Sequence, residues 1–419
     1  MKKIIYIVIA LVVLGVLGKL LLVSDDVGPA PTVTATLAPE EKIVRGAYLA
    51  KAGDCMACHT TRGGQQYAGG RALQTPFGTV ISPNITSDKA TGIGGWSSDD
   101  FWHALHNGKA KDGRLLYPAF PYTNYTRITR DDADALYAYL QTVPAVTQAN
   151  QPHQLRFPYS LQISLAAWRM LYFKPEVFRP ETNQSVDWNR GAYLVQGLGH
   201  CSACHSARNP LGGSEGESLS GGMIPAQGWY APALNARGDW QQDHLAALLK
   251  TGVSPRAAVF GPMAEVVKES LQYLNDGDIN AIAVYLKALP AEAKPAAFER
   301  EGAPEAVAFL AAGAKLYEKH CAECHGAEGK GQSPAYPPLA GNQALIMTNA
   351  VNPIRMVLNG GFAPATAGNP RPYSMPPFSH TLNDLEVAQL VSYLRSAWGN
   401  NAPPVNATDV NRFRAVPLD

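Results

Sequence analysis

Apolar residues recur at helical spacing in three similar segments of the chain, which begin at Arg45, Arg190 and Ala312. The segments read RGAYLAKAGDCMACHT, RGAYLVQGLGHCSACHS and AGAKLYEKHCAECHG. In each of them an adjacent tyrosine and leucine lie on the apolar face of an amphipathic helix. A second amphipathic segment follows each one: DDADALYAYLQTVP, GDINAIAVYLKALP and LEVAQLVSYLRSAW. The pattern predicts a mainly α-helical chain in which a whole module with two such helices occurs three times.

A further helix is predicted inside the first module, over SSDDFWHALHNGK. Phe101, Trp102 and Leu105 define its buried face at helical periodicity. His106 borders this face, whereas His103 lies on the opposite side.

The longest apolar run extends from Ile4 to Val23 and is interrupted only by Lys19. Twenty residues rise about 30 Å as a helix, which matches the hydrocarbon core of a bilayer. We therefore expect residues 1–24 to form a transmembrane anchor, with a cleaved signal segment as the alternative. Lys2 and Lys3 keep the N-terminus in the cytoplasm, so both interpretations export the remaining chain. Residues 25–40 then form a linker.

Composition narrows the class of protein. Charged residues make up 16 % of the chain and the net charge is +1, so nothing indicates nucleic-acid binding. The 38 glycines and 32 prolines indicate modules rich in loops rather than one long helical bundle.

The cysteines show the chemistry of the modules. All six belong to three Cys-x-x-Cys-His motifs: Cys55, Cys58 and His59; Cys201, Cys204 and His205; Cys321, Cys324 and His325. This motif attaches haem c through two thioethers and places its histidine on one face of the iron. A redox dithiol or a zinc site could use a single copy, but three copies without an unpaired cysteine favour three covalent haems c. Attachment of haem c also places the modules on the periplasmic side of a bacterial inner membrane.

We call the three modules repeat I (41–148), repeat II (186–292) and repeat III (305–400). Residues 149–185 connect the first two repeats, and residues 401–419 form a C-terminal tail. A helix on either side of a haem is typical of class I cytochrome c domains. The predicted fold is therefore three tandem class I cytochrome c domains behind an N-terminal transmembrane helix.

The second axial ligand of such a haem is usually a methionine from a loop between the two helices. Met263 follows His205 by 58 residues and Met375 follows His325 by 50, so both are candidate distal ligands. Methionine is a soft ligand that favours reduced iron and raises the reduction potential. Core packing is the alternative role of each methionine.

Repeat I has Phe120 at the equivalent place, 61 residues after His59, and phenylalanine cannot bind iron. His106 is the candidate distal ligand of haem I. The alternatives are a polar role for His106 at the helix end, an open or water-bound iron, or ligation by Met170. We therefore expect haem I to differ electronically from the other two haems.

The connection between repeats I and II contains an apolar, aromatic stretch over residues 155–173. It is too short and too broken to span a bilayer. We expect it to cover the adjoining domains, with contact to a partner or a membrane as the alternative.

Three longer stretches resemble a known family: TPFGTVISPNITSDKATGIGGWSSDDFWHAL, RGAYLVQGLGHCSACHSARNPLGG, and YPPLAGN followed by SMPPF. Together they resemble the triple-haem cytochrome c subunits of bacterial membrane-bound dehydrogenases, such as alcohol, gluconate and aldehyde dehydrogenase complexes. The resemblance extends over roughly residues 40 to 400. It implies that a separate catalytic subunit oxidises the substrate, and that this chain passes the electrons to ubiquinone, a terminal oxidase or a cytochrome c.

Phe120 departs from the YPAMPY sequence of alcohol and gluconate dehydrogenase cytochromes. The YPAFPY version is more similar to cytochromes that accompany molybdenum and iron–sulfur dehydrogenases of aldehydes or N-heterocycles. We therefore favour such a catalytic partner over one that contains pyrroloquinoline quinone or flavin. The alternative function is a peroxidase-like enzyme with an open haem I, and a free electron shuttle is a third class that the anchor disfavours.

Overall fold

The computed structural model describes residues 37–214, 219–235, 240–290, 298 and 303–416. The predicted anchor lies outside the described residues, as does most of the linker that follows it. Within the described ranges, no helix combines the length and the apolar character needed to cross a membrane.

By its contacts the chain divides into two compact units. Unit 1 contains Met1–Ala50, Cys58–Pro180 and Gln196–His200, and unit 2 contains Lys51–Ala57, Glu181–Val195 and Cys201–Asp419. Repeats II and III thus lie largely in one unit. The division into three domains stays a prediction.

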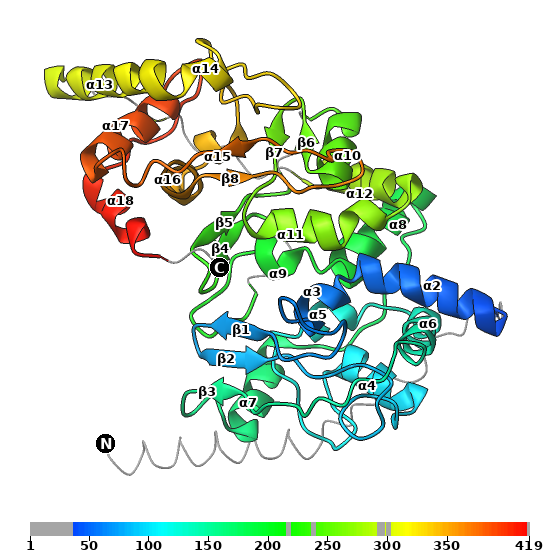
Figure 1. The fold of residues 1–419 in the computed structure, drawn as a ribbon. Coiled ribbons are helices and arrows are strands. Elements are labelled where there is room, and N and C mark those ends of the chain that lie inside the picture. The colour runs from blue at the N-terminus through cyan, green and yellow to red at the C-terminus, as the bar shows by residue number, and fades with distance from the viewer. Residues whose placement is uncertain (1–36, 215–218, 236–239, 291–297, 299–302, 417–419) are drawn as a thin grey trace, which may run out of the picture. The chain divides into compact units, whose positions relative to one another are not determined.

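Residues 37–180 fold into helices with one small sheet (Figure 1). The helices are α2 (Pro39–Ala52), α3 (Cys55–His59), α4 (Ser98–Asn107), α5 (Tyr122–Tyr125), α6 (Arg130–Leu140) and α7 (Gln162–Tyr172). The antiparallel sheet has the order β1 (Ala72–Thr75), β2 (Gly78–Ile81), β3 (Gln154–Leu155). Leu73 faces Val80 across the first pair, and Thr79 faces Gln154 across the second.

The chain from residue 186 onward is also mainly helical. Its first elements are α8 (Val186–Tyr193), a π-helical turn (Leu194–Leu198), α9 (Ser202–His205), α10 (Gln242–Thr251), α11 (Pro262–Glu269), a 3-10 turn (Leu271–Tyr273) and α12 (Asp276–Ala288). The later helices are α13 (Pro304–His320), α14 (Ala322–His325), α15 (Gln343–Ile346), α16 (Val351–Asn359), α17 (Asp384–Leu394) and α18 (Ala407–Arg414). Three antiparallel strand pairs join them: β4 (Gly222–Ile224) with β5 (Trp229–Ala231), β6 (Val253–Ser254) with β7 (Ala257–Ala258), and β8 (Gly361–Phe362) with β9 (Ser374–Met375).

The helices predicted within the three repeats are confirmed, and capping side chains mark where several of them begin. The second helix of each repeat starts after Thr129, Asn275 or Asn383, whose side chain accepts a backbone N–H of the first turn. Helix α4 starts at a capping box between Ser97 and Asp100. Such caps satisfy N–H groups that have no partner within the helix.

A glycine lets the two helices of each repeat cross closely. A Cβ atom at Gly46, Gly191 or Gly313 would overlap the carbonyl oxygen of Ala135, Ala281 or Gln389 on the facing helix. It would also lie 2.7–2.9 Å from the Cβ of a tyrosine on that helix: Tyr139, Tyr285 or Tyr393. The same contact thus occurs between α2 and α6, between α8 and α12, and between α13 and α17.

An ion pair next to this crossing occurs in the first two repeats. Arg45 pairs with Asp132 at 2.5 Å. Arg190 binds both carboxylate oxygens of Asp278 at 2.7 Å. Ala312 replaces the arginine in repeat III, so this repeat relies on the glycine crossing without the ion pair.

Asp278→Asn is expected to lower the free energy of unfolding of unit 2 by about 1–2 kcal/mol. The variant loses the bidentate ion pair with Arg190, which is partly screened by solvent because the arginine side chain is 32 % exposed. Asp276→Asn is the matched control. It removes the same charge from the same helical turn, but the Asp276 side chain is 97 % exposed. Denaturant titration followed by circular dichroism measures the free energy of unfolding of both variants. An equal loss of stability in the two would show that the Arg190–Asp278 ion pair does not stabilise unit 2.

The tail after repeat III contains a helix that was not expected. Asn406 and Asp409 form a capping box at the start of α18, and this short sequence signal could have predicted the helix. Val410 is fully buried in the hydrophobic core of repeat III. Arg414 donates to Asp384 at 2.6 Å. Residues 407–414 therefore belong to the fold of repeat III.

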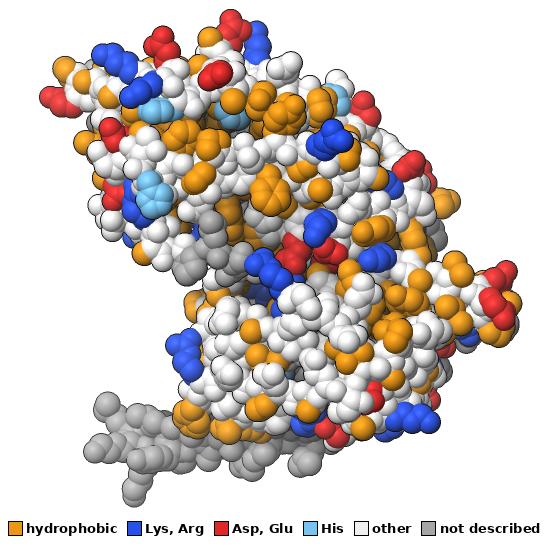
Figure 2. Space-filling view, viewed as in Figure 1, with side chains coloured by type: hydrophobic (Ala, Val, Ile, Leu, Met, Phe, Trp, Pro, Cys, Tyr) orange, Lys and Arg blue, Asp and Glu red, His pale blue; other side chains and the backbone are white. Residues whose placement is uncertain are grey.

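The visible surface carries mixed charges. Figure 2 shows acidic and basic side chains interspersed among many hydrophobic ones, with no large area of one sign on this face. This agrees with the net charge of +1.

Candidate haem sites

Each Cys-x-x-Cys-His motif forms a single helical turn, at α3, α9 and α14. In repeats II and III the backbone N–H of the histidine, His205 or His325, donates to the carbonyl of the first cysteine at 2.9 Å. A turn of this kind places the two thiols and the imidazole on one side of a short helix. The local structure therefore fits the predicted attachment of haem c.

All three motif histidines are held in the same way. Nδ1 of His59 donates to the carbonyl oxygen of Pro83 at 2.8 Å. The equivalent bonds join His205 to Pro232 at 2.7 Å and His325 to Pro337 at 2.9 Å. Because a carbonyl only accepts, Nδ1 carries the proton and Nε2 keeps its lone pair for a metal.

Burial supports the neutral form of these histidines. Desolvation lowers the pKa of His59 and of His325, although the bond to the proline carbonyl opposes the effect. Neutral imidazole is the form that binds iron. The three prolines, which follow their histidines by 24, 27 and 12 residues, were not predicted to have a role. Their only sequence signal is a proline in SPNIT, APALN and YPPLA.

The thiols are unlike those of a redox dithiol. None of the six cysteines forms a disulfide. Burial raises the pKa of Cys201 to about 12 and that of Cys321 to about 11. Reactive Cys-x-x-Cys pairs instead have lowered pKa values. Across the described ranges, no group of three or more histidine, cysteine or acidic side chains could hold a metal ion by itself. The neutral thiols of Cys201 and Cys321, each in a motif with an oriented imidazole, fit haem c better than dithiol chemistry.

The two candidate distal methionines lie at well-defined places. Met263 is half-buried in the first turn of α11, just after Gly261, whose φ of 57° favours glycine. Met375 is half-buried in β9, opposite Gly361 of β8. It packs against the hydrophobic core of repeat III. Ligation by both methionines stays a prediction.

Phe120 forms an aromatic contact instead of offering a ligand. Its ring lies 5.4 Å from that of Tyr125. Tyr125 in turn lies 5.6 Å from the ring of His200, the residue that directly precedes Cys201. These three residues belong to unit 1. An aromatic series therefore extends from the loop of Phe120 to the segment that leads into the second haem motif.

His106 and His103 lie on the faces that were predicted. His106 is 2 % exposed, and its ring stacks on Trp102 at 4.4 Å. Its Nδ1 donates to the carbonyl oxygen of Thr126 at 2.7 Å, so Nε2 keeps its lone pair. Burial lowers its pKa. His103 is exposed. The protonation of His106 thus matches that of the motif histidines, and its role as a ligand of haem I stays a prediction.

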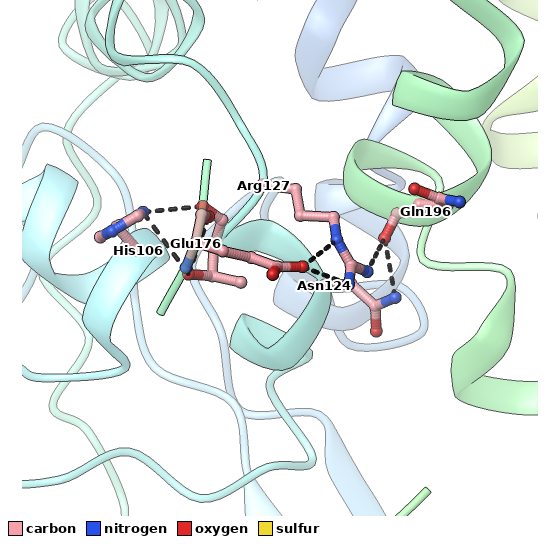
Figure 3. Close-up of polar contacts among 6 residues, drawn as sticks. His106, Asn124, Arg127, Glu176 and Gln196 are labelled. Atoms are coloured by element: carbon pink, nitrogen blue, oxygen red, sulfur yellow. Dashed lines mark hydrogen bonds and ion pairs between the residues drawn. The ribbon is translucent and has the colours of Figure 1, made fainter. Parts of the chain in front are cut away.

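Figure 3 shows the polar contacts around His106. Thr126 accepts the backbone N–H of Glu176 through its hydroxyl at 3.0 Å. The Glu176 carboxylate accepts from Arg127 Nε at 2.7 Å. Asn124 then donates to the carbonyl of Gln196 at 2.9 Å. Glu176, in the connection between repeats I and II, is therefore bonded to Thr126 and Arg127, which follow Phe120 in the sequence.

Helix α7 contacts the loop of Phe120 at residues before and after the phenylalanine. The Gln162 amide bonds both the N–H and the carbonyl of Leu115, at 2.8 and 3.3 Å. The Arg169 guanidinium lies 5.2 Å from the Tyr122 ring. Leu171 on the same helix remains 69 % exposed. Residues 155–173 thus contact repeat I on their inner face, while the covering of repeat II and contact of the outer face with a partner or a membrane stay predictions.

Comparison with known proteins agrees with this geometry. A cytochrome c family model matches residues 43–144 and 310–398, which lie within repeats I and III. The gluconate 2-dehydrogenase cytochrome c subunit of Pantoea cypripedii is 41 % identical over 396 residues, covering 89 % of each chain. This chain belongs to the cytochrome c subunits of dehydrogenases.

Other members of this family serve different substrates. The alcohol dehydrogenase (quinone) cytochrome c subunit of Gluconacetobacter polyoxogenes is 38 % identical over 393 residues, covering 89 % of this chain and 84 % of that protein. A nicotinate dehydrogenase subunit of Pseudomonas putida is 42 % identical over 370 residues, covering 86 % of this chain but 30 % of that protein. The family resemblance predicted from the sequence is confirmed, and with it covalently bound haem c.

Proposed function

We propose that this cytochrome c subunit carries three haems c and transfers electrons within a membrane-bound dehydrogenase complex. The observation that carries the proposal is the threefold occurrence of an attachment turn whose histidine is bonded to a proline carbonyl. Bound haem c supplies reversible one-electron chemistry at its iron. The residues of the chain attach it, orient its proximal ligand and limit its access to water.

The ligand set that we propose follows from the same residues. His59, His205 and His325 bind the proximal faces, and Met263 and Met375 bind the distal faces of haems II and III. His106 is the candidate for haem I. The haem domains lie on the periplasmic side of the bacterial inner membrane, anchored by residues 1–24.

A separate catalytic subunit supplies the electrons, and ubiquinone, a terminal oxidase or a cytochrome c accepts them. We favour a molybdenum and iron–sulfur catalytic subunit over one with pyrroloquinoline quinone or flavin. Two observations support this choice: Phe120 in place of a methionine, and the similarity to the nicotinate dehydrogenase protein of Pseudomonas putida.

The proposal is tested by extracting the tagged chain gently in detergent and identifying the cofactor of any protein that co-purifies with it. Molybdopterin with an iron–sulfur protein would support the favoured partner. Pyrroloquinoline quinone or flavin would support the other dehydrogenases and make Phe120 a local variation. A chain without a partner that turned over peroxide would contradict an electron-transfer subunit.

Phe120 favours one alternative, a peroxidase-like enzyme with an open haem I. Cyanide and carbon monoxide distinguish the two functions, because they bind readily only where the sixth coordination position is open. Rapid cyanide binding to one of three haems, together with peroxide turnover, would favour the enzyme. Slow cyanide binding to all three haems would favour an electron-transfer protein in which a side chain such as His106 occupies the sixth position of haem I.

Phe120→Met is expected to raise the potential of haem I by on the order of 0.1 V, a fraction of the roughly 0.8 V that axial ligands span, and to slow cyanide binding. The reason is that the new thioether enters a loop that matches those of Met263 and Met375. Phe120→Leu is the control, since leucine is apolar but cannot bind iron. Spectropotentiometry measures both variants, and equal shifts would exclude ligation from this loop.

A further inference from the structure

Strand β5 adjoins the two residues of unit 2 that would hold the iron of haem II, His205 and Met263. Its last residue, Ala231, precedes Pro232, whose carbonyl accepts the proton of His205 at 2.7 Å. Its first residue, Trp229, packs against Gly261: a Cβ atom built on that glycine would lie 2.9 Å from the indole ring. Gly261 precedes Met263 by two residues. A shift of this three-residue strand would therefore disturb the proximal bond and the distal loop together.

The outer edge of β5 is bound by a side chain from repeat III. The Asn352 amide on α16 accepts the N–H of Tyr230 at 3.0 Å and donates to its carbonyl at 2.8 Å. β5 pairs with β4 alone in its sheet, so Asn352 supplies the hydrogen bonds that a third strand would make. Asn352 is 5 % exposed, and buried bonds of this kind are costly to break.

Arg355, one turn further along α16, holds the beginning of the same strand. Its guanidinium carbon lies 4.6 Å from the centre of the Trp229 ring, and the side chain is 1 % exposed. The adjoining Gly228 has a φ of 67°, and a Cβ atom there would lie 2.7 Å from Arg355 Nη1. Helix α16 thus contacts three successive residues, from Gly228 to Tyr230. Figure 1 shows α16 and β5 in their places along the chain.

We propose that Asn352 and Arg355 of repeat III are positioning residues for the axial ligands of haem II and thereby determine its reduction potential. The proposal rests on the proposed ligation by His205 and Met263. A β5 strand that is held in place keeps the Met263 loop closed, and a thioether ligand favours reduced iron. Release of β5 loosens this ligand and lowers the potential. Repeat III thus acts on the electron affinity of a haem that is attached to repeat II.

The test is Asn352→Leu in the full-length, haem-loaded protein, with Asn342→Leu as the matched control. Asn342 lies in the same repeat, and its amide also makes two backbone bonds, to Ala344 and Pro338, but these lie within repeat III. Redox titration followed by magnetic circular dichroism resolves the haems, and a Met263→Leu reference identifies haem II. This measurement needs no dehydrogenase turnover.

Asn352→Leu is expected to lower the equilibrium constant for reduction of haem II about tenfold, which is 59 mV for one electron. It should also weaken the methionine-to-iron charge-transfer band of haem II and leave haem I unchanged. Asn342→Leu should leave haem II unchanged. Arg355→Lys is a second variant, which keeps the charge but loses the planar group that stacks on Trp229. It should lower the reduction potential of haem II by a smaller amount than Asn352→Leu.

The proposal would be overturned by an unchanged haem II potential in both Asn352→Leu and Arg355→Lys, or by an equal shift in Asn342→Leu. If Met263→Leu itself altered no haem, the assigned ligand set, and not the role of α16, would be at fault. Haem content near three per chain in every variant shows that the comparison is between intact proteins.

Discussion

Gly191→Ala is expected to lower the free energy of unfolding of unit 2 by about 3 kcal/mol, at the upper end of the usual cost of overpacking. The new Cβ atom would overlap the carbonyl oxygen of Ala281, and a backbone atom in the middle of α12 cannot move without separating the two helices. Separation would also expose Tyr285, which is 3 % exposed in the structure. Denaturant titration followed by circular dichroism measures the loss.

Gly277→Ala provides the control in the same helix. A Cβ atom there meets only the side-chain oxygen of Asn275, at 3.2 Å. Alanine has a higher helix propensity than glycine, so this variant should be neutral or more stable by up to about 1 kcal/mol. Equal stability of Gly191→Ala and the wild-type protein would show that the close helix crossing does not support the fold.

Met375→Leu is expected to lower the potential of haem III by on the order of 0.1 V or more, because axial-ligand identity accounts for a span of roughly 0.8 V. Leucine keeps most of the volume in the core of repeat III but cannot bind iron. The same variant should open haem III to cyanide. Spectropotentiometry and cyanide titration of the full-length protein measure the two effects.

Met347→Leu is the control for this experiment, since Met347 is also half-buried in repeat III but lies after α15 rather than in the β9 strand. It should leave the potential of haem III within experimental error. If Met375→Leu behaved like Met347→Leu, Met375 would be a core residue, which is the alternative role that its sequence allows.

Much of the helical architecture was predictable because it is encoded locally. The faces of α4 follow from periodicity alone, so His106 was correctly placed at the buried face and His103 at the exposed one. The three helix pairs follow from the same periodicity and from recurring tyrosines. Helix α18 shows the limit of that reasoning, because its apolar pattern is weak and only Asn406 with Asp409 indicated it.

The distal side of haem I was the least predictable part of the candidate sites. The sequence could show that Phe120 cannot bind iron and that His106 was the best substitute. It could not show that Nδ1 of His106 is bonded to Thr126, that Gln162 binds Leu115 before Phe120, or that Glu176 binds Thr126 after it. These contacts join residues that are 20 to 50 positions apart, and neither periodicity nor spacing carries information about such pairs.

The sequence by itself predicted where haem attaches and which histidine binds it, because five adjacent residues contain the whole attachment motif. It also determined the family, through long stretches shared with dehydrogenase cytochromes. Only the tertiary structure decided which carbonyl orients each histidine, and that Asn352 of repeat III binds the strand that leads to Pro232 beside His205. The physical reason is that a buried hydrogen bond is specified by how distant segments pack, and the same proline or asparagine would look ordinary in any loop.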